Sequence, residues 1–207
     1  MKKWTIPSII ILSLIIFGIS IRGGRGIALD YIFIEAVQNL VSAKWNWPYF
    51  ITTIGNVSTY FAIYPIVLAY CYLKKDYRLL ITLLMATLIS NLLVEVFKHI
   101  FIRIRPENFM RITQGGFSFP SGHASVSSAT LWTLARIMRV QTNRDKYLRY
   151  LAIFLPFLIG LTRIILGVHW PTDIIAGLLL GYAVSSITPD LSKRLKNRLK
   201  LKQYKII

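Results

Sequence analysis

Short polar segments that lie between strongly apolar stretches of this chain contain a group of residues that could do chemistry. The residues are Lys98, Arg105-Pro106, Pro120-Ser121-Gly122-His123, Arg163, His169 and Asp173. Polar groups are costly inside a bilayer, so a group of them at the ends of apolar helices usually marks a functional site. Three cations, two histidines and a carboxylate suit one task well, which is to hold a phosphate and cleave it through a histidine.

Asp173 lies four residues after His169, with Pro171 between them. Proline favours the first position of a helix and an acidic residue favours the first turn, so we expect Asp173 to lie in the first turn of a helix. Its carboxylate could then accept a hydrogen bond from one ring nitrogen of His169 and leave the other free as a nucleophile. The alternative is a helix-capping aspartate beside an interfacial histidine, which the pair considered alone favours.

The tetrapeptide Pro120-Ser121-Gly122-His123 is expected to open a helix. The N-terminus of a helix binds anions through its free N–H groups and its dipole. Gly122 would let a substrate approach the backbone, Ser121 could cap the helix or donate to a phosphate oxygen, and His123 could act as a general acid. An ordinary capped helix start is the alternative.

Lys98, Arg105 and Arg163 could neutralise three phosphoryl oxygens. Phosphoryl transfer depends on positioning and on stabilising equatorial charge, and the fork of an arginine fits an oxyanion well. Each of these cations alone could instead extend to the lipid headgroups, as basic residues at the ends of membrane spans normally do. Three of them beside two histidines favour the phosphate interpretation.

Composition predicts a membrane protein. Of the 207 residues, 55% are hydrophobic, and the mean hydropathy is +0.54. Apolar stretches reach about 20 residues, the length that crosses a bilayer core. The net charge of +17 could indicate nucleic-acid binding, but the basic residues flank apolar stretches, so we expect no nucleic-acid partner. Cys71 is the single cysteine, which excludes an intrachain disulfide and a thiolate metal site.

The predicted fold class is an all-α polytopic membrane protein with six transmembrane helices, in a single domain over residues 1–207. We expect the spans near residues 4–21, 53–73, 79–97, 123–139, 149–167 and 172–190. No small-residue cleavage pattern follows the first span, so it is expected to be retained and not cleaved as a signal peptide.

Two segments outside the spans are expected at the membrane surface. Residues 22–52 are too polar to span and are interpreted as an interfacial helical segment between the first and second spans, with an aromatic belt. Residues from about 191 to 207 form a basic tail, predicted either as a helix on the anionic inner leaflet or as a disordered charged segment.

The distribution of lysine and arginine predicts the orientation. One side of the predicted membrane carries 17 of these residues, including both chain ends, and the other carries 8. The positive-inside rule places the first set, and both termini, in the cytoplasm. The group of polar residues then falls at the outer face of the cell membrane.

The order and spacing of these residues resemble the type 2 phosphatidic acid phosphatase superfamily of integral membrane lipid phosphatases. Its first motif, Lys, six residues and Arg-Pro, matches Lys98 to Pro106, and its second, Pro-Ser-Gly-His, is present unchanged at 120–123. Its third, Ser-Arg, five residues, His, three residues and Asp, matches Thr162-Arg163, His169 and Asp173. Thr162 for Ser is the one departure, and it keeps a hydroxyl.

The resemblance implies roles for the residues. His169 would attack phosphorus and form a phosphohistidine, Asp173 would orient it, and His123 would protonate the leaving group. The phosphate would be held by Lys98, Arg105, Ser121, the Gly122 amide and Arg163. The resemblance implies no metal and no cofactor.

The partners implied by the resemblance are a lipid phosphate substrate and the surrounding membrane lipids. Small bacterial members act on undecaprenyl pyrophosphate, phosphatidylglycerol phosphate or phosphatidic acid, and an outward-facing site favours the polyprenyl pyrophosphate. A non-enzymatic phosphate or anion carrier is the alternative, since it would use the same cations. A soluble vanadium haloperoxidase conflicts with six apolar spans, and a metal hydrolase would lose activity with a chelator.

Overall fold

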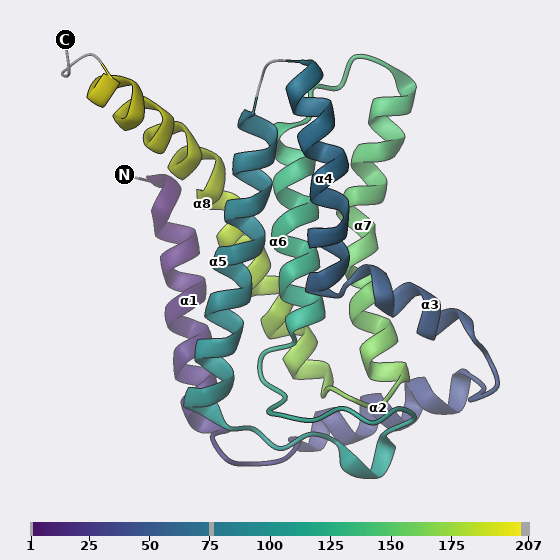
Figure 1. Ribbon diagram of the computed structural model, residues 1–207. Coiled ribbons are helices and arrows are strands. Elements are labelled where there is room, and N and C mark those ends of the chain that lie inside the picture. Colours follow the sequence, from purple (N-terminus) through teal and green to yellow (C-terminus); the bar gives the residue numbers. More distant parts are fainter. Residues whose placement is uncertain (1, 75–76, 204–207) are drawn as a thin grey trace.

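The computed structural model describes residues 2–74 and 77–203, which form helices and connecting segments and contain no β-strand. Six helices run along the molecule and two shorter ones lie at one end of it (Figure 1). The long helices are α1 (Lys2–Ser20), α4 (Val57–Leu73), α5 (Arg78–Phe101), α6 (Gly122–Ile137), α7 (Asn143–Ile165) and α8 (Pro171–Gln203). The shorter ones are α2 (Ala28–Leu40) and α3 (Trp47–Ile54), and η1 (Glu107–Phe109) is a single 3-10 turn. The predicted all-α class is confirmed.

Each predicted span coincides with one long helix, but their lengths differ. Within the described residues, Arg78–Phe101, Asn143–Ile165 and Pro171–Leu195 are long and apolar enough to cross a membrane. A fourth crossing results if α3 and α4, which meet at a bend of 57°, count as one span. The apolar part of α1, Trp4–Ser20, and the 16-residue α6 are shorter than a typical span.

The second span begins later than predicted. We expected a helix from residue 53, whereas α3 ends at Ile54 and α4 begins at Val57. Asn56 caps α4, because its side chain accepts a hydrogen bond from the backbone N–H of Ser58 at 3.3 Å. Gly55 and Asn56, at this break, line a cavity described below.

The predicted interfacial segment and the predicted tail are both helical where the structure describes them. Residues 22–52 contain α2 and most of α3, and α8 continues through the tail as far as Gln203. Residues 204–207 and the side chain of Leu199 lie outside the described part of the chain.

Helix α6 lies at the centre and packs against α5, α7 and most extensively α8. Its buried side chains are nearly all small or hydroxylated, which allows neighbouring backbones to approach closely. Gly177 and Gly181 of α8 make this approach possible. A Cβ at Gly177 would lie 2.6 Å from the carbonyl oxygen of Ser121, and one at Gly181 would lie 2.7 Å from that of Ser125.

Hydroxyl groups join the helices through hydrogen bonds in place of water. Ser90 of α5 and Ser125 of α6 are 2.8 Å apart, and Thr87 of α5 lies 2.7 Å from Thr130 of α6. Tyr64 of α4 also bonds Thr87. Such bonds between buried polar groups fix the register of helices whose outer surface is apolar.

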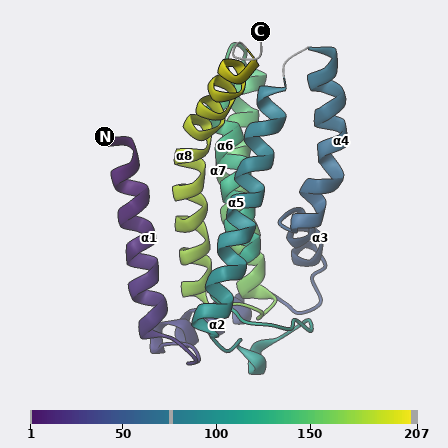
Figure 2. The ribbon, with the colours of Figure 1, turned by 60° about the vertical axis from the view of Figure 1, so that its left-hand side comes forward.

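The outer surface carries many large apolar side chains, as expected for a membrane protein. Ile9, Leu12, Ile16 and Ile19 of α1 are each more than half exposed. Patches of this extent are rare on monomeric soluble proteins. α1 and α4 flank the bundle on opposite sides in the turned view (Figure 2).

The two ends of the bundle differ. α1 begins and α8 ends at the upper end in Figure 1, so these two helix ends lie at the same end of the bundle. The lower end carries α2, α3 and the segments 102–121 and 166–170. Every residue of the predicted site lies in these segments or at the adjoining ends of α5, α6, α7 and α8.

Candidate active site

Backbone hydrogen bonds tie the connecting segments of the lower end to one another. The N–H of Ser118 donates to the carbonyl of Arg103 at 2.9 Å, and that of Ser121 donates to the carbonyl of Asp173 at 3.1 Å. The N–H of Ile104 donates to the carbonyl of Gly24 at 3.0 Å. Residues far apart in the sequence are therefore held together by the main chain itself.

A cavity of about 140 Å³ lies among these segments. It is larger than one water molecule needs, which is about 10–15 Å³ by the same measure. Six of the eight residues that the sequence predicts for the site line it: Lys98, Arg105, Gly122, His123, Arg163 and His169. The others along its wall are Gly55, Asn56, Val57, Asn91, Glu95, Gln114 and Val126. The structure thus brings the three separate motifs together around one space.

His169 and Asp173 have the predicted arrangement. Pro171 begins α8, and Asp173 lies in the first turn with its carboxylate toward the ring of His169. His169 Nδ1 is 3.5 Å from Asp173 Oδ2, longer than a good hydrogen bond, so Nδ1 has no hydrogen-bond partner. Catalytic hydrogen bonds are often long in a free enzyme and shorten when substrate binds.

The other ring nitrogen of His169 is an acceptor. Nε2 lies 3.3 Å from Nη1 of Arg105, and a guanidinium can only donate. The proton of the neutral ring is therefore on Nδ1, which faces Asp173, and the lone pair is on Nε2. His169 also lines the cavity. This is the tautomer that a nucleophilic histidine needs.

Burial keeps this ring neutral. Desolvation lowers the pKa of His169 well below its usual value, and the charges of Arg105, Arg163 and Lys98 lower it further. A cation is disfavoured both in a buried position and near other cations. His169 is thus unprotonated at neutral pH.

Arg105 holds the segment that follows η1. Its Nε donates to the carbonyls of Gly115 and Gly116 at 3.1 and 2.9 Å, and its Nη2 donates to that of Phe117 at 3.0 Å. Burial lowers the pKa of Arg105 to about 10, so the guanidinium remains charged at neutral pH. Arg105 therefore both orders this loop and places a positive charge beside His169.

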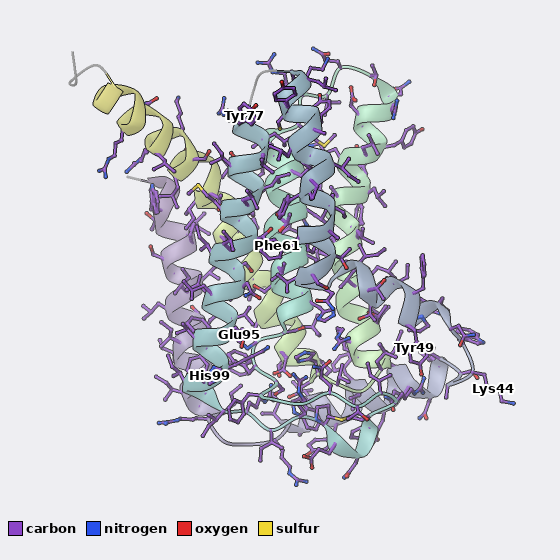
Figure 3. The ribbon with its side chains drawn as sticks, viewed as in Figure 1. Lys44, Tyr49, Phe61, Tyr77, Glu95 and His99 are labelled. Carbon is purple, nitrogen blue, oxygen red and sulfur yellow. The ribbon has the colours of Figure 1, made fainter. Side chains whose placement is uncertain are left out.

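The two other cations are anchored at the edge of the cavity. Arg163 donates to Thr52 Oγ1 of α3 at 2.8 Å and to Gln114 Oε1 at 3.1 Å. Lys98 forms an ion pair with Glu95 at 3.0 Å. Figure 3 shows Glu95 and His99 toward the loop end of α5, and Tyr77 at the opposite end. His99 bonds the carbonyl of Glu95 at 2.8 Å and does not line the cavity.

Several buried polar atoms at this site have no hydrogen-bond partner. Among the described residues there are five such atoms, and three of them belong to predicted site residues: Ser121 Oγ, Arg163 Nε and His169 Nδ1. Ser121 precedes α6 but makes no capping bond, so of its two predicted roles the structure favours donation to a ligand. Buried polar groups are nearly always satisfied, so Ser121 Oγ and Arg163 Nε are available to hydrogen-bond a polar ligand.

The N-terminus of α6 opens onto the same cavity through Gly122 and His123. A Cβ at Gly122 would approach Lys98 Nζ only to 4.0 Å, so the backbone here is accessible. Gly55 packs against His123, since a Cβ at Gly55 would lie 3.2 Å from its Cδ2. Free helical N–H groups beside three cations make a site for an anion. Within the described residues, no three His, Cys, Asp or Glu side chains are grouped to hold a metal ion.

Two residues near the site were missed by sequence reasoning. Arg103 and Asp30 are fully buried, and Arg103 contacts both Asp30 and Asp173 at 2.6 Å. Arg103 is one of the eight lysines and arginines counted on the less basic side of the predicted membrane, and Asp30 lies in the segment interpreted as interfacial. The available signal was an acidic residue among apolar ones at 27–34, because a buried charge requires a partner.

Comparisons with known proteins agree with this arrangement. A family model described as the PAP2 superfamily matches residues 79–196, more than half of the chain. An undecaprenyl-diphosphatase of Sulfolobus acidocaldarius is 33% identical over 57% of this chain and 57% of its own length. Phosphatidylglycerophosphatase B of Bacillus subtilis is 29% identical over 52% of this chain and 55% of its own length. The chain thus spans a little over half the length of these relatives.

A solved structure shares the fold over nearly the whole chain. It is the transmembrane PAP2-type phosphatidylglycerolphosphate phosphatase of Bacillus subtilis, which superimposes with a TM-score of 0.74 at 24% identity. The match covers 94% of this chain and 98% of that one. The helical arrangement, including α1 to α3, which precede the residues matched by the family model, is therefore that of a known membrane phosphatase.

Proposed function

Because this chain belongs to the PAP2 superfamily, we propose that it is a membrane phosphatase that hydrolyses a phosphomonoester or pyrophosphate of a lipid through a phosphohistidine. One observation carries the proposal. A single cavity is lined by the nucleophilic nitrogen of His169, by three cations and by the N-terminus of α6. Such a space fits a tetrahedral dianion and one attacking group.

In the first step, the lone pair on His169 Nε2 attacks phosphorus. A P–N bond forms as the bond between phosphorus and the lipid oxygen breaks, and His123 gives its proton to that oxygen. The ring of His169 becomes positively charged, and the carboxylate of Asp173, 3.5 Å from Nδ1, stabilises it. His123 must be protonated at the start of this step, and the negative charge of the phosphate bound beside it favours the charged ring.

In the second step, water enters the space that the lipid leaves. His123, now neutral, takes a proton from the water as its oxygen attacks phosphorus, and the P–N bond breaks. Inorganic phosphate is released, the electron pair returns to His169 Nε2, and His123 is again protonated. The reaction returns every group to its initial state and consumes one water.

The cations and the helix N-terminus stabilise the transferring group. Charge accumulates on the equatorial oxygens in the transition state, and donors already in place for it cost no reorganisation. Lys98, Arg105 and Arg163 line the cavity, and the Ser121 hydroxyl and the Gly122 amide are the neutral donors. The partnerless Nε of Arg163 would gain its hydrogen bond from the bound phosphate.

The proposal includes a location and a topology. Six spans with both termini in the cytoplasm put the cavity at the outer face of the cell membrane, in accordance with the excess of basic residues at the other end. Residues 1–207 then act as one domain, with a basic tail from about residue 191 against anionic inner-leaflet lipids. The start of α1 and the end of α8 lie at the same end of the bundle, which fits an even number of crossings.

Among lipid phosphates we propose undecaprenyl pyrophosphate as the substrate, with phosphatidylglycerol phosphate and phosphatidic acid as the other candidates. A site at the outer headgroup level is accessible to a polyprenyl pyrophosphate released on that side. The names of the two curated relatives include a diphosphatase of this kind and a phosphatidylglycerophosphatase.

The decisive experiment is phosphate release from a panel of these three lipids by the detergent-purified chain. His169→Ala should abolish release, by about 10⁴-fold or more, while the lipid still binds. His99→Ala is the matched control, since this histidine lies in the last turn of α5, at the loop end of the bundle, but does not line the cavity. Full release by His169→Ala would exclude the phosphohistidine, and loss of release with a chelator would indicate a metal hydrolase.

A further inference from the structure

A chain of buried charges lies directly behind the proposed nucleophile. Arg103 Nη2 is 2.6 Å from Asp30 Oδ2, Arg103 Nη1 is 2.6 Å from Asp173 Oδ1, and none of the three side chains is exposed. The other oxygen of Asp173 faces His169. The order in space is therefore Asp30, Arg103, Asp173, His169.

The contacts of Asp173 leave it a single orientation. Oδ1 accepts from Arg103, and Oδ2 accepts from the backbone N–H of Trp170 at 2.9 Å. Oδ2 is also the carboxylate oxygen that lies 3.5 Å from His169 Nδ1. Without Arg103 the carboxylate would be free to rotate, and it would also be an unbalanced buried charge.

Arg103 is itself held from behind. Asp30 accepts from Arg103 and from the backbone N–H and hydroxyl of Thr172, at 2.9 and 3.0 Å, as well as from the N–H of Ile27. Arg103 also donates to Thr172 Oγ1 at 2.8 Å and to the carbonyl of Arg25 at 3.3 Å. Asp30 thus fixes α2, the start of α8 and the guanidinium in one arrangement.

Arg103 does not line the cavity, so it does not belong to the phosphate-binding cations. Two carboxylates share one guanidinium here, whereas a simple structural ion pair would need only one. Asp30 is on α2, outside residues 79–196 that the family model matches. The arrangement is explained if the guanidinium of Arg103 orients the carboxylate of Asp173, which faces His169.

We propose that Arg103 and Asp30 are positioning residues, which orient Asp173 so that it holds the ring of His169 for attack on phosphorus. This inference rests on the proposed histidine chemistry. It adds α2 to the catalytic apparatus, since the position of this helix determines the orientation of Asp173 through two ion pairs. Substrate binding should not depend on Arg103 or Asp30.

The experiment compares Arg103→Gln, Arg103→Lys and Asp30→Asn with wild type, using the lipid that the panel shows to be hydrolysed fastest. We expect Arg103→Gln to slow formation of alkali-stable phosphohistidine in a single turnover by about 10²-fold, the usual cost of a misplaced catalytic group. The Kd for the lipid should be unchanged. Arg103→Lys should recover part of the rate, and Asp30→Asn should lose about 10-fold, because the guanidinium remains but is less well held.

Combination with Asp173→Asn separates positioning from a general loss of stability. Asp173→Asn alone should cost about 10⁴-fold, as in other His–Asp pairs. If Arg103 acts through Asp173, the double variant Arg103→Gln/Asp173→Asn should be no slower than Asp173→Asn. Additive losses in this cycle would overturn the proposal.

Arg111→Gln is the matched control. Arg111 also ties a loop to α2, by donating to the carbonyls of Gln38 and Val41 at 2.9 Å, but it does not touch Asp173. It should lower the melting temperature and leave the rate of phosphohistidine formation intact. An equal loss of rate in this control would show that the attachment of α2, and not the orientation of Asp173, matters.

The outcomes also separate this inference from the proposed function. If His169→Ala keeps its activity, the histidine chemistry itself is wrong. If His169→Ala is inactive but folded Arg103→Gln and Asp30→Asn are as fast as wild type, only the positioning role is wrong. Should Arg103→Gln fail to fold, Asp30→Asn, which has nearly the same shape as the natural residue, carries the test.

Discussion

Two groups of charged side chains meet at the loop end of the bundle, and they differ in how they are paired. In the first group, Asp30, Arg103 and Asp173 contact one another at 2.6 Å and are wholly buried. In the second group, which lines the cavity, Arg163 and Arg105 bind only neutral oxygens and one histidine nitrogen. In the first group each charge is paired with an opposite charge of the protein, whereas the second group has an excess of positive charge.

The difference separates charges that the protein itself pairs from charges that are available to a ligand. A buried charge with all its partners in the protein holds parts of the chain together and needs no ligand. A buried cation with an unbonded N–H, such as Arg163, is costly until an anion arrives. The two kinds lie only a few residues apart in the sequence, since Arg103 and Arg105 flank Ile104. Substitutions in the two groups should therefore both lower the rate, but they should differ in their effect on stability.

The largest effect should come from breaking the paired group. Arg103→Gln leaves two carboxylates without a counter-charge, and removal of one partner of a buried pair costs about 3–5 kcal/mol. We expect a marked fall in the denaturant or heat resistance of the purified chain, measured by the loss of monodisperse protein in detergent. A melting temperature equal to that of wild type would contradict the distinction between the two groups.

Substitution in the cavity should reverse this pattern. Arg163→Gln removes a cation that stabilises the transferring phosphoryl group, so the rate of phosphate release should fall by about 10²–10³-fold. Because the charge is not balanced within the protein, stability should be unchanged or higher. The same pair of measurements, phosphate release and melting temperature, checks both arms. A variant that melted much earlier than wild type would place Arg163 with the structural group.

Inorganic phosphate should distinguish the groups without any test of catalysis. A ligand that binds only the folded state stabilises it by RT ln(1 + [L]/Kd), or about 2.7 kcal/mol at 100 times the Kd. Wild type and His99→Ala should thus melt at a higher temperature in phosphate, and Arg163→Gln should respond less. Sodium chloride at equal ionic strength controls for salt. Equal shifts in all three proteins would mean that phosphate does not bind in the cavity.

The smallest expected effect concerns pH. Burial and nearby cations lower the pKa of His169, so the folded protein cannot take up the proton that an exposed histidine binds near pH 6.5. The unfolded chain binds it, and the free energy of unfolding should fall as the pH drops below about 6.5. Ring ¹⁵N shifts should show His169 neutral at pH 5.5. Protonation of His169 near pH 6.5 would contradict the buried, cation-flanked site.

Sequence reasoning was sufficient for the helices and for the convergence of the three motifs, but not for the paired group. Apolar stretches of about 20 residues predict long helices because that length crosses a bilayer. The placement of Asp173 in the first turn of a helix, near His169, follows from the spacing of the two residues around Pro171. Asp30 and Arg103 are 73 residues apart, and nothing in either neighbourhood specifies the other. Tertiary contacts of this kind depend on where α2 packs at the loop end of the bundle, and the local sequence pattern does not determine that position.

The start of α4 shows a second limit. The sequence from residue 53 is mostly apolar and predicts an unbroken span, because Gly55 and Asn56 are only two residues within it. In the structure this dipeptide separates α3 from α4 and lines the cavity next to His123. A helix that would otherwise pass straight through is bent, and the bend brings Thr52 within reach of Arg163.

The glycine contact between α6 and α8 affects how the enzyme site responds to the thickness of the bilayer. The backbone itself sets the spacing of His123 from His169. Gly177 packs on the carbonyl of Ser121, and the N–H of Ser121 donates a hydrogen bond to the carbonyl of Asp173. Peripheral helices such as α1 and α4 can tilt to match a thinner or thicker hydrocarbon layer. The two histidines stay in register during such adjustments, so turnover should be insensitive to the acyl-chain length of the host membrane.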